Sequence, residues 1–363
     1  MLSHKEQFSV FFNKVKSFSS LFTTYKQKSQ TQQLINSALY DKNQDIAQDI
    51  LKKHGKEALD YFKTTKDKSI FIRNNTVISF KIIDNNVIVL GDPVGPQSEL
   101  EDTLAEFMNY CDVNSWNLSF FQSSNKFLST YHKYGFDKLK IGSEAIVDVA
   151  DFDLVGPKKK DFRNRIRKLE KLGFFIKEYS KGAVNDELFA KLKVISDEWL
   201  DEPNRIERNF SLGYFSKEYI NNSTILTVEN EAGDVVAFVN LIPSFKNGQI
   251  TIDLMRKSKA APSGVMDYIF VKAILELKEQ GYNSLSLGLA PMSGFQKDEE
   301  VTMTEKTVYE IFKRLNFLFN YEGLKVFKDK FATSWDSKFL IYRDLPQLPG
   351  LAFSIKRVLE EIS

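Results

Sequence analysis

Two residues with catalytic chemistry and two lysines stand together between a strand-like and a helix-like stretch, Gly248 to Phe270 ("GQITIDLMRKSKAAPSGVMDYIF"). Asp253 can act as a general base, and the planar fork of Arg256 suits an oxyanion or a phosphate. Lys257 and Lys259 follow in a cationic loop. The alternative is a strand-end salt bridge that only orders this loop.

The spacing of Asp253 and Arg256 makes a structural demand. Residues three apart on a regular strand point to opposite faces of the sheet. If both side chains serve one site, the strand must bulge or end between them. A shared site therefore predicts an irregular backbone at this point.

Lys328 is the third candidate, in a segment that we predict as a closing hairpin over residues 323–343 ("GLKVFKDKFATSWDSKFLIYR"). On a strand, Lys328 shares one face with Val326. A lysine on the inner face of an apolar hairpin is costly unless it is paired. Lys328 is thus either a functional cation or a residue of the solvated face, with Lys330 as the substitute candidate.

Composition argues against several other chemistries. The 363 residues include three histidines and one cysteine, and no HExxH, CxxC, GxSxG or GxxxxGK[ST] motif occurs. Metal hydrolysis, thiol chemistry and nucleotide hydrolysis are therefore not expected. The single Cys111 rules out an internal disulfide and fits a reducing compartment. We find no apolar run long enough to cross a bilayer and no signal-peptide pattern, so we expect a soluble chain without a metal site.

The order of elements along the chain repeats: antiparallel strands, a helix, then a further strand. This pattern predicts an α+β protein of two similar domains, each a mixed, mostly antiparallel sheet flanked by helices. We place the domains at residues 1–155 and 183–363, with a basic linker helix and strand at residues 156–182. Residues 5–62 are predicted to be helical. The segment 351–363 has one apolar face, which predicts a helix that docks on the core or lies in a lipid interface.

The linker "GPKKKDFRNRIRKLEKLGF" has the spacing of an amphipathic helix. Its apolar stripe consists of Phe162, Ile166, Leu169 and Leu172. Its other faces carry the cations Lys158, Lys159, Lys160, Arg163, Arg165, Arg167, Lys168 and Lys171. The helix is either a solvated face or a binding surface for a polyanion, with Arg163, Arg167 and Lys171 as the contacts. The polyanion would be a nucleic-acid backbone or anionic lipid.

Several segments together resemble the aminoacyl-phosphatidylglycerol synthases, the catalytic domains of the bacterial multiple peptide resistance factor. In the second half these are "SLGYFSKEYI", "VVAFVNLIP", "IDLMRKSKAAPSGVMDYIFV", "GYNSLSLGLAPMSG" and "GLKVFKDKFATSWDSKFLIY". In the first half they are "HGKEALDYF", "DKSIF", "VLGDPVGP" and "GSEAIVDVADFDLVGPKKKDFRNRIRKLEKLGF". The similarity spans nearly the whole chain and keeps the order of the segments.

The resemblance implies two tandem acyltransferase folds of the GNAT type. It also implies transfer of an aminoacyl group from aminoacyl-tRNA to the glycerol hydroxyl of phosphatidylglycerol, which lowers membrane negative charge and gives resistance to cationic antimicrobial peptides. Lysyl is preferred because the chain resembles Gram-positive members. No cofactor beyond the aminoacyl-tRNA donor is implied. The site of action would be the cytoplasmic face of the bacterial membrane, where full-length relatives carry an N-terminal transmembrane flippase domain.

The resemblance also assigns roles to residues. The residues expected to be catalytic are Asp253, Arg256 and Lys328. Those expected to bind the aminoacyl group are Asp267, Ser293, Glu310 and Glu322. Those expected to contact tRNA or lipid phosphate are Arg163, Arg167, Lys171, Lys257 and Lys259. The loop "RKSKAAPSG" has a single glycine and lacks an evident phosphate cradle of backbone amides, so a donor other than coenzyme A fits better.

Three other functions are possible: a tRNA-dependent peptidoglycan-type aminoacyl ligase, a non-catalytic polyanion-binding module, and a coenzyme A-dependent acetyltransferase. For the preferred function, a bulky lipid and a bulky tRNA could hardly share one entrance. We therefore predict a tunnel across the second half with Asp253, Arg256 and Lys328 near its middle. The first half would shape and cover this site.

Overall fold

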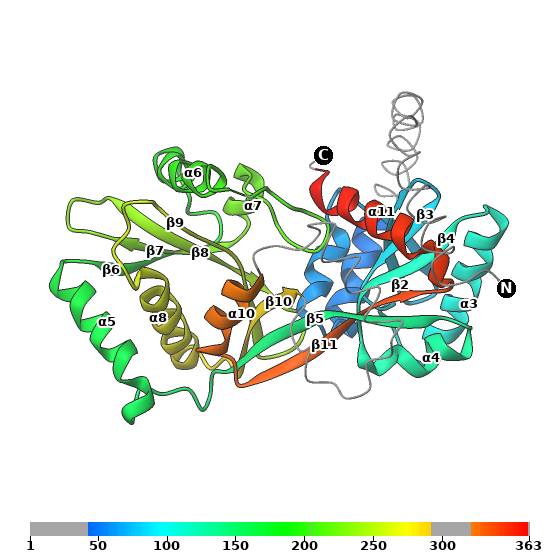
Figure 1. The fold of residues 1–363 in the computed structure, drawn as a ribbon, viewed down its shortest axis with the longest axis horizontal. Coiled ribbons are helices and arrows are strands. Elements are labelled where there is room, and N and C mark those ends of the chain that lie inside the picture. Colours follow the sequence, from blue (N-terminus) through cyan, green and yellow to red (C-terminus); the bar gives the residue numbers. More distant parts are fainter. Residues whose placement is uncertain (1–42, 204, 292–320, 362–363) are drawn as a thin grey trace, which may run out of the picture.

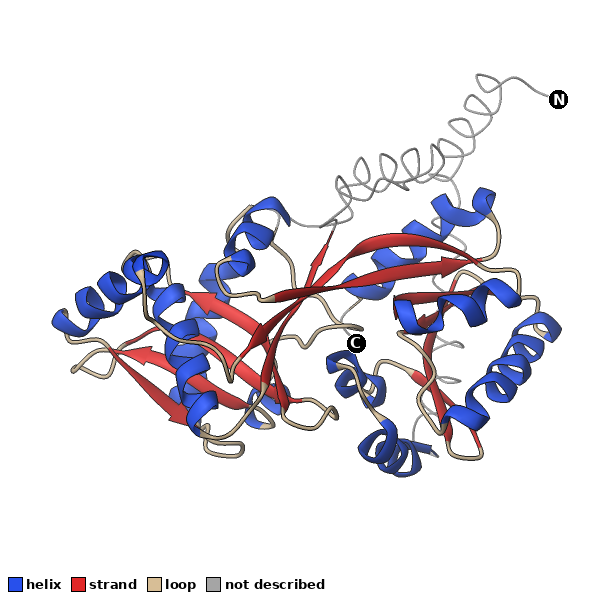
Figure 2. Cartoon of the chain, turned by 90° about the horizontal axis from the view of Figure 1, so that it is seen from below, coloured by secondary structure: helices blue, strands red, loops and turns tan. Residues whose placement is uncertain are grey.

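The computed structural model describes residues 43–203, 205–291 and 321–361 (Figure 1). The described strands form one eleven-stranded sheet that runs through both halves of the chain. Helices lie on both sides of this sheet (Figure 2). Two pairs of its strands are parallel and the others are antiparallel. The predicted α+β class with a mixed, mostly antiparallel sheet is confirmed.

From residue 43 onward, the first half contains five strands and a short 3-10 helix, η2, that precedes them. Its elements are η2 (Ala58–Thr64), β1 (Ser69–Arg73), β2 (Thr76–Ile83), β3 (Asn86–Leu90), α3 (Gln97–Val113), β4 (Asn117–Ser124), α4 (Leu128–Lys133) and β5 (Asp137–Asp148). Residues 43–54 are also helical. The two-residue turn between β2 and β3 uses Asp84 (φ 51) and Asn85 (φ 64), as a tight hairpin of right-twisted strands requires.

The second half begins with the basic helix. Its elements are α5 (Lys160–Lys171), β6 (Phe175–Tyr179), α6 (Asp186–Leu200), α7 (Lys217–Asn221), β7 (Thr224–Glu229), β8 (Val235–Pro243), β9 (Gln249–Lys257), α8 (Val265–Glu279), β10 (Ser284–Pro291), α10 (Tyr321–Asp329), β11 (Ser334–Tyr342) and α11 (Leu348–Glu360). The strand order across the sheet is β1-β2-β3-β4-β11-β5-β10-β9-β8-β7-β6.

The predicted repeat is visible in this strand order. In the first half β1, β2 and β3 are antiparallel, α3 crosses over, and β4 returns parallel to β3. In the second half β7, β8 and β9 are antiparallel, α8 crosses over, and β10 returns parallel to β9. Both halves are therefore built from the same unit.

The last strand of each half lies in the other half. β4 pairs with β11 rather than with β5, and β10 pairs with β5 rather than with β11. The two exchanged strands also pair with each other along the middle of the sheet. This exchange brings first-half residues into the second-half sheet. The domain limits at residues 155 and 183 stay a prediction.

The helix α11 packs on the first half. Its residues Leu351, Ile355 and Val358 are buried in one cluster with Ile88 of β3 and Phe121 of β4. Docking of this segment on the core is thus confirmed for the residues that the structure describes, and the apolar face is not left for lipid.

Two other predictions of local structure have different outcomes. The closing hairpin is wrong, because residues 321–329 form the helix α10 and only β11 follows as a strand. The spacing of Leu324 and Phe327 fits the helix, since residues at i and i+3 share one helical face. Of the helix expected over residues 5–62, residues 1–42 lie outside the described part of the chain.

Candidate active site

A β-bulge in β9 places Asp253 and Arg256 on the same face. Val239 of β8 lies opposite Met255, and Leu241 lies opposite Ile252, so two residues of β9 face the single residue between them on β8. This is the irregularity that a shared site predicts, and it is confirmed. Ile252 and Met255 pack in one core cluster on the α8 side, so residues three apart here share a face.

The partner of the bulge is Asn240 of β8. Its side-chain oxygen accepts a hydrogen bond from the backbone N–H of Leu254 at 2.6 Å, and the side chain is fully buried. A bulged strand leaves a backbone group without its ladder partner, and a buried donor of this kind needs another acceptor. Asn240 supplies that acceptor and so stabilises the geometry that Asp253 requires.

Asp253 receives two hydrogen bonds on one carboxylate oxygen. The backbone N–H of Gly213 (2.9 Å) and the hydroxyl of Tyr219 (2.6 Å) both donate to Oδ2. Gly213 is needed at this point because a Cβ would overlap the ring of Tyr219. Burial raises the pKa of Tyr219 well above its usual value, as does the charge of Asp253, so the phenol stays a donor.

Burial also raises the pKa of Asp253 to about 6. The hydrogen bonds from Tyr219 and Gly213 and the charge of Arg256 act in the opposite direction. A carboxylate with this pKa is ionised at neutral pH and is a stronger base than an exposed aspartate. The half-buried side chain is therefore suited to accept a proton from a hydroxyl.

The side chain of Arg256 is only 3% exposed and contacts two polar groups and an aromatic ring. Its guanidinium donates to Ser196 of α6 and to Glu207 (2.7 Å), and it stacks 4.7 Å from the ring of Trp199. Glu207 in turn accepts from the backbone N–H of Phe215, close to Gly213. This geometry favours the loop-ordering interpretation of Arg256 over a direct contact with a lipid phosphate.

Lys328 lies where β9 and β10 separate. The two parallel strands pair only from Gln249 to Thr251 and from Ser284 to Ser286, although both continue further. A bulge then interrupts the pairing of β10 with β5 between Ser286 and Leu289.

The bulge in β10 binds the amine of Lys328 through two backbone carbonyls. Gly288 takes a positive φ of 73 there, and the amine of Lys328 donates to the carbonyls of Gly288 (3.1 Å) and Leu289 (2.8 Å). The strand-face argument for Lys328 is wrong because the residue is helical. The lysine is nevertheless buried (2% exposed) and paired, as an inner-face lysine must be.

Burial lowers the pKa of Lys328 to about 7, although the charges of Glu144 and Asp253 raise it. The amine therefore exchanges its proton near neutral pH, which suits a group that stabilises an oxyanion or protonates a leaving oxygen. Asp253 and Lys328 have pKa values moved toward each other in one part of the fold. Strongly shifted pKa values of this kind cluster at functional sites.

The acid and the lysine approach from opposite sides of the sheet. The partners of Asp253 belong to α7 and to the segment before it, and Arg256 packs on α6. On the other side, Phe327 of α10 contacts Phe270 of α8, with ring centroids 5.0 Å apart. The separated strands β9 and β10 lie between the two groups.

The first half also reaches this site. Tyr61 of η2 is half-buried, and its pKa is raised by burial and by the charge of Asp253. The sequence pattern does not indicate Tyr61, Gly213, Tyr219 or Glu207 as site residues. The segment "SLGYFSKEYI" resembles the family, but the long-range contacts of its residues carry no periodic signal.

The other predicted site residues are scattered. Asp267 is buried at the start of α8 and forms ion pairs with Arg165 of α5 and with Lys330 (2.7 Å), so it already has two cationic partners. Lys257 is exposed at the end of β9, and Lys259 lies 3.4 Å from Asp201. Ser293 and Glu310 lie outside the described residues, as does the side chain of Glu322.

The basic helix α5 uses some of its cations internally. Arg163 donates to the carbonyls of Leu154 and Gly156, which fixes the loop before the helix. Arg167 and Lys171 are exposed. Two of the three predicted contact residues therefore point to solvent, and the third supports the local backbone.

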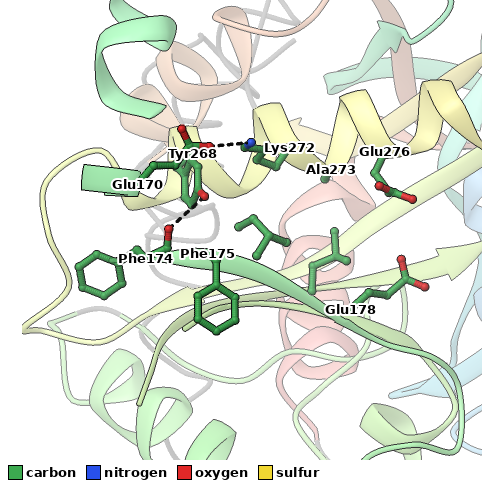
Figure 3. Close-up of a pocket in the computed structure, with 10 residues that line it drawn as sticks. Glu170, Phe174, Phe175, Glu178, Tyr268, Lys272, Ala273 and Glu276 are labelled. Carbon is green, nitrogen blue, oxygen red and sulfur yellow. Dashed lines mark hydrogen bonds and ion pairs between the residues drawn. The ribbon is translucent and has the colours of Figure 1, made fainter. Parts of the chain in front are cut away.

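A cavity of about 450 Å³ lies elsewhere, between β6 and α8 (Figure 3). The carboxylates of Glu178 and Glu276 lie toward one end of it, and Tyr268 and the Glu170–Lys272 ion pair (2.8 Å) lie toward the other. Three glutamates and one lysine line this cavity, a charge balance that disfavours a phosphate. None of the candidate catalytic residues lines it, so we do not assign it to the reaction.

Comparison with known proteins decides the family. A family model described as "Phosphatidylglycerol lysyltransferase, C-terminal" matches residues 48–342. The chain belongs to this family. Over 314 residues it is 32% identical to the phosphatidylglycerol lysyltransferase of Bacillus subtilis (strain 168), an alignment that covers 85% of the chain and 36% of that protein. The Staphylococcus epidermidis (strain ATCC 12228) enzyme is 29% identical over 312 residues, covering 85% of the chain and 37% of that protein.

Solved structures of the family have the same fold. The structure of L-PGS from Bacillus licheniformis matches with a TM-score of 0.76 and 30% identity, covering 87% of the chain and 96% of that structure. The C-terminal domain of a putative lysylphosphatidylglycerol synthetase from Agrobacterium fabrum matches with a TM-score of 0.77 and 28% identity, covering 88% and 98%. FemX shares the fold alone (TM-score 0.53, 10% identity, covering 86% and 98%).

The chain spans about 36% of the length of the curated relatives that it matches first. In the part of the chain that the structure describes, no helix combines the length and the apolar character that a membrane span needs. The family match covers both halves and the eleven strands that the structure describes, so the exchanged sheet lies within the family region.

Proposed function

We propose that this chain transfers a lysyl group from lysyl-tRNA to a glycerol hydroxyl of phosphatidylglycerol. The observation that carries the proposal is that the buried amine of Lys328 lies where strands β9 and β10 separate, within reach of the charge of Asp253. A base on one side and a cation on the other suit two substrates that meet from opposite sides. The family's description supports a lysyl group and phosphatidylglycerol as the reactants, and aminoacyl-tRNA as the donor is part of our proposal.

The first step is attack on the aminoacyl ester. The lipid hydroxyl attacks the ester carbonyl carbon while its proton passes to Asp253 Oδ1, the oxygen opposite the one held by Gly213 and Tyr219. A C–O bond forms and the carbonyl becomes a tetrahedral oxyanion. The ammonium of Lys328 stabilises this charge because burial keeps water from screening it.

The second step is collapse of the intermediate. The bond to the ribose oxygen breaks, and that oxygen takes a proton from Lys328. The proton on Asp253 then restores the lysine charge through the products or solvent. The aminoacyl ester is already activated, so the reaction needs no further cofactor.

The partners follow from these substrates. We propose lysyl-tRNA as donor and phosphatidylglycerol at the cytoplasmic face of the bacterial membrane as acceptor. The greater length of the relatives fits a protein with an additional membrane flippase domain. A lysyl ester adds two ammonium groups to a lipid that carries one phosphate charge. The product therefore reduces attraction of cationic antimicrobial peptides.

A transfer assay tests the proposal. The purified chain is incubated with lysyl-tRNA labelled in the lysyl group and with vesicles that contain phosphatidylglycerol. We expect the label to move into the lipid phase as an alkali-labile ester. Vesicles of phosphatidylcholine, which has no glycerol hydroxyl, are the control. Label that reaches a peptidoglycan precursor instead of lipid would favour the ligase function, and label that stays on tRNA would contradict catalysis.

We further propose that the exposed cations of α5 bind one of these anionic substrates. Arg167→Glu with Lys171→Glu should raise the KM for lysyl-tRNA or for vesicles about tenfold and flatten the salt dependence, because two phosphate contacts are lost. Varying each substrate in turn identifies which one binds. The control, Lys53→Glu with Lys181→Glu, makes the same charge change at exposed positions away from α5. Unchanged KM values at low salt would contradict this proposal and favour the alternative that the cations of α5 only face solvent.

A further inference from the structure

A row of charged side chains, half-buried at Glu57 and buried at Lys338 and Glu144, runs from the first half to the carbonyls that bind Lys328. Lys338 of β11 is 3% exposed and contacts two carboxylates, Glu57 at 2.9 Å and Glu144 at 3.0 Å. Glu57 precedes η2 in the first half, and Glu144 lies on the exchanged strand β5. Burial raises the pKa of Glu57, but the charges of Lys338 and Lys126 outweigh it and hold the pKa at about 2.

Ser286 connects Glu144 through hydrogen bonds to the β10 bulge that binds the Lys328 amine. Ser286 donates its hydroxyl to Glu144 at 2.5 Å and accepts the backbone N–H of Gly288 at 3.1 Å. Gly288 and Leu289 are the residues whose carbonyls hold Lys328, and Leu289 lies directly opposite Glu144 in the β10–β5 pair. The carboxylate therefore supports the bulge that carries these two carbonyls.

We propose that Glu144 is a positioning residue of the transfer site, one that fixes the Lys328 amine and keeps it in the ammonium form. This inference rests on the proposed function. Lys338 and Glu57 hold Glu144 in turn, so the first half takes part in the chemistry of the second through the exchanged strands. The first half thus does more than shape and cover the site.

The charges that face Lys328 come from the strands. Glu144 on β5 and Asp253 on β9 are the carboxylates of the described residues whose charges raise the pKa of Lys328. The cation Lys338 on β11 stands behind Glu144. β10 contributes only the carbonyls of its bulge. Removing the charge of Glu144 thus leaves Asp253 as the remaining strand carboxylate that acts on the lysine.

The helices near Lys328 add no comparable charge among the described residues. On α10 itself, Lys325 and Asp329 pair with each other at 2.6 Å. α8 packs against α10 through Phe270, while its Asp267 is held by Lys330 and Arg165. A shift in the titration of Lys328 after a change at Glu144 can therefore be attributed to Glu144.

The test is Glu144→Gln in the whole chain, which keeps the shape and removes the charge. Loss of a nearby negative charge favours the neutral amine, so the alkaline limb of kcat should move to lower pH by about one unit. The KM for lysyl-tRNA should stay unchanged. Titration of the Lys328 13Cε signal by NMR, assigned with Lys328→Met, should show the same shift without relying on turnover.

Three further variants separate positioning from folding. Glu57→Gln weakens the ion pair with Lys338, which lies farthest from Lys328. It should lower the melting temperature without moving the alkaline limb of kcat. Ser286→Ala should lower kcat at an unchanged limb, because it removes the link and not the charge. Glu144→Asp keeps the charge, so the alkaline limb of kcat should stay at the pH of the unchanged chain. This variant replaces the Gln variant in the test if the latter does not fold.

Two outcomes are decisive. A Gln variant with the parent limb and the parent NMR titration would overturn the inference, as would an Asp variant with a shifted limb. If the unchanged chain transfers no lysyl group to lipid, the proposed function fails. The NMR titration still reports in that case whether Glu144 controls the Lys328 amine.

Discussion

Asp253→Asn is expected to lower kcat for lysyl transfer about a thousandfold, within the range for loss of a general base, while the fold stays intact. Gly213 and Tyr219 both donate to the same oxygen, so one amide oxygen can replace it and keep both hydrogen bonds. The amide nitrogen then takes the position of Oδ1, which has to accept the proton. The variant thus loses the base and keeps the local structure.

Stability supplies the control for this variant. The folded-state pKa of Asp253 is about 6, above the usual 3.8. Its contribution to stability is therefore present below pH 3.8 and is lost as the pH rises through 6. Asparagine never ionises, so at pH 8 the variant should melt at the same temperature as the parent or higher. Glu276→Gln, in the cavity of Figure 3, should leave kcat unchanged. Turnover of Asp253→Asn at the parent rate would remove the carboxylate from the mechanism.

Lys328→Met is expected to lower kcat about a hundredfold or more with little effect on KM, because the cation acts on charge that develops only in the transition state. Methionine fills a similar volume and removes a buried amine that is costly to charge. The alkaline limb set by the pKa of about 7 should disappear from the remaining activity. The pH dependence of kcat in single-turnover reactions measures both effects.

Lys330→Met is the matched control for this lysine. Lys330 follows α10, is exposed, and pairs with Asp267 at 2.7 Å. Its loss should change stability and leave the alkaline limb in place. If Lys330→Met removes the limb and Lys328→Met does not, the substitute assignment made from the sequence is the correct one.

Much of the second-half site could be predicted because its constraint is local. The demand that Asp253 and Arg256 share a face follows from strand geometry, and the bulge in β9 meets it. The repeated strand and helix pattern likewise follows from local periodicity. The expected catalytic roles of these residues came from the resemblance to the family, because periodicity carries no information on chemical role.

The error at Lys328 has a physical cause. In "VFKDKF" apolar and polar residues alternate, which is typical of a strand over so short a window. The helix forms because Phe327 and Phe331 turn toward Phe270 of α8, a contact more than fifty residues away in sequence. Val326, which the strand pattern treated as a face-mate of Lys328, is 64% exposed.

The loop that holds Asp253 could not be predicted for a related reason. Gly213, Tyr219 and Glu207 act through single long-range contacts rather than through a repeated pattern. A glycine in a loop has many explanations, and only the position of the Tyr219 ring shows why a side chain is excluded at Gly213.

The exchange of β5 and β11 also constrains the order in which the sheet can form while the chain is being synthesised. Residues up to Asp148 leave the ribosome long before Ser334, so β5 at first lacks both of its neighbours, β10 and β11. β4 likewise keeps an open edge until β11 arrives. Such distant pairings form slowly and leave strand edges exposed to wrong partners. Completion of the candidate site is therefore tied to the emergence of β11 from the ribosome.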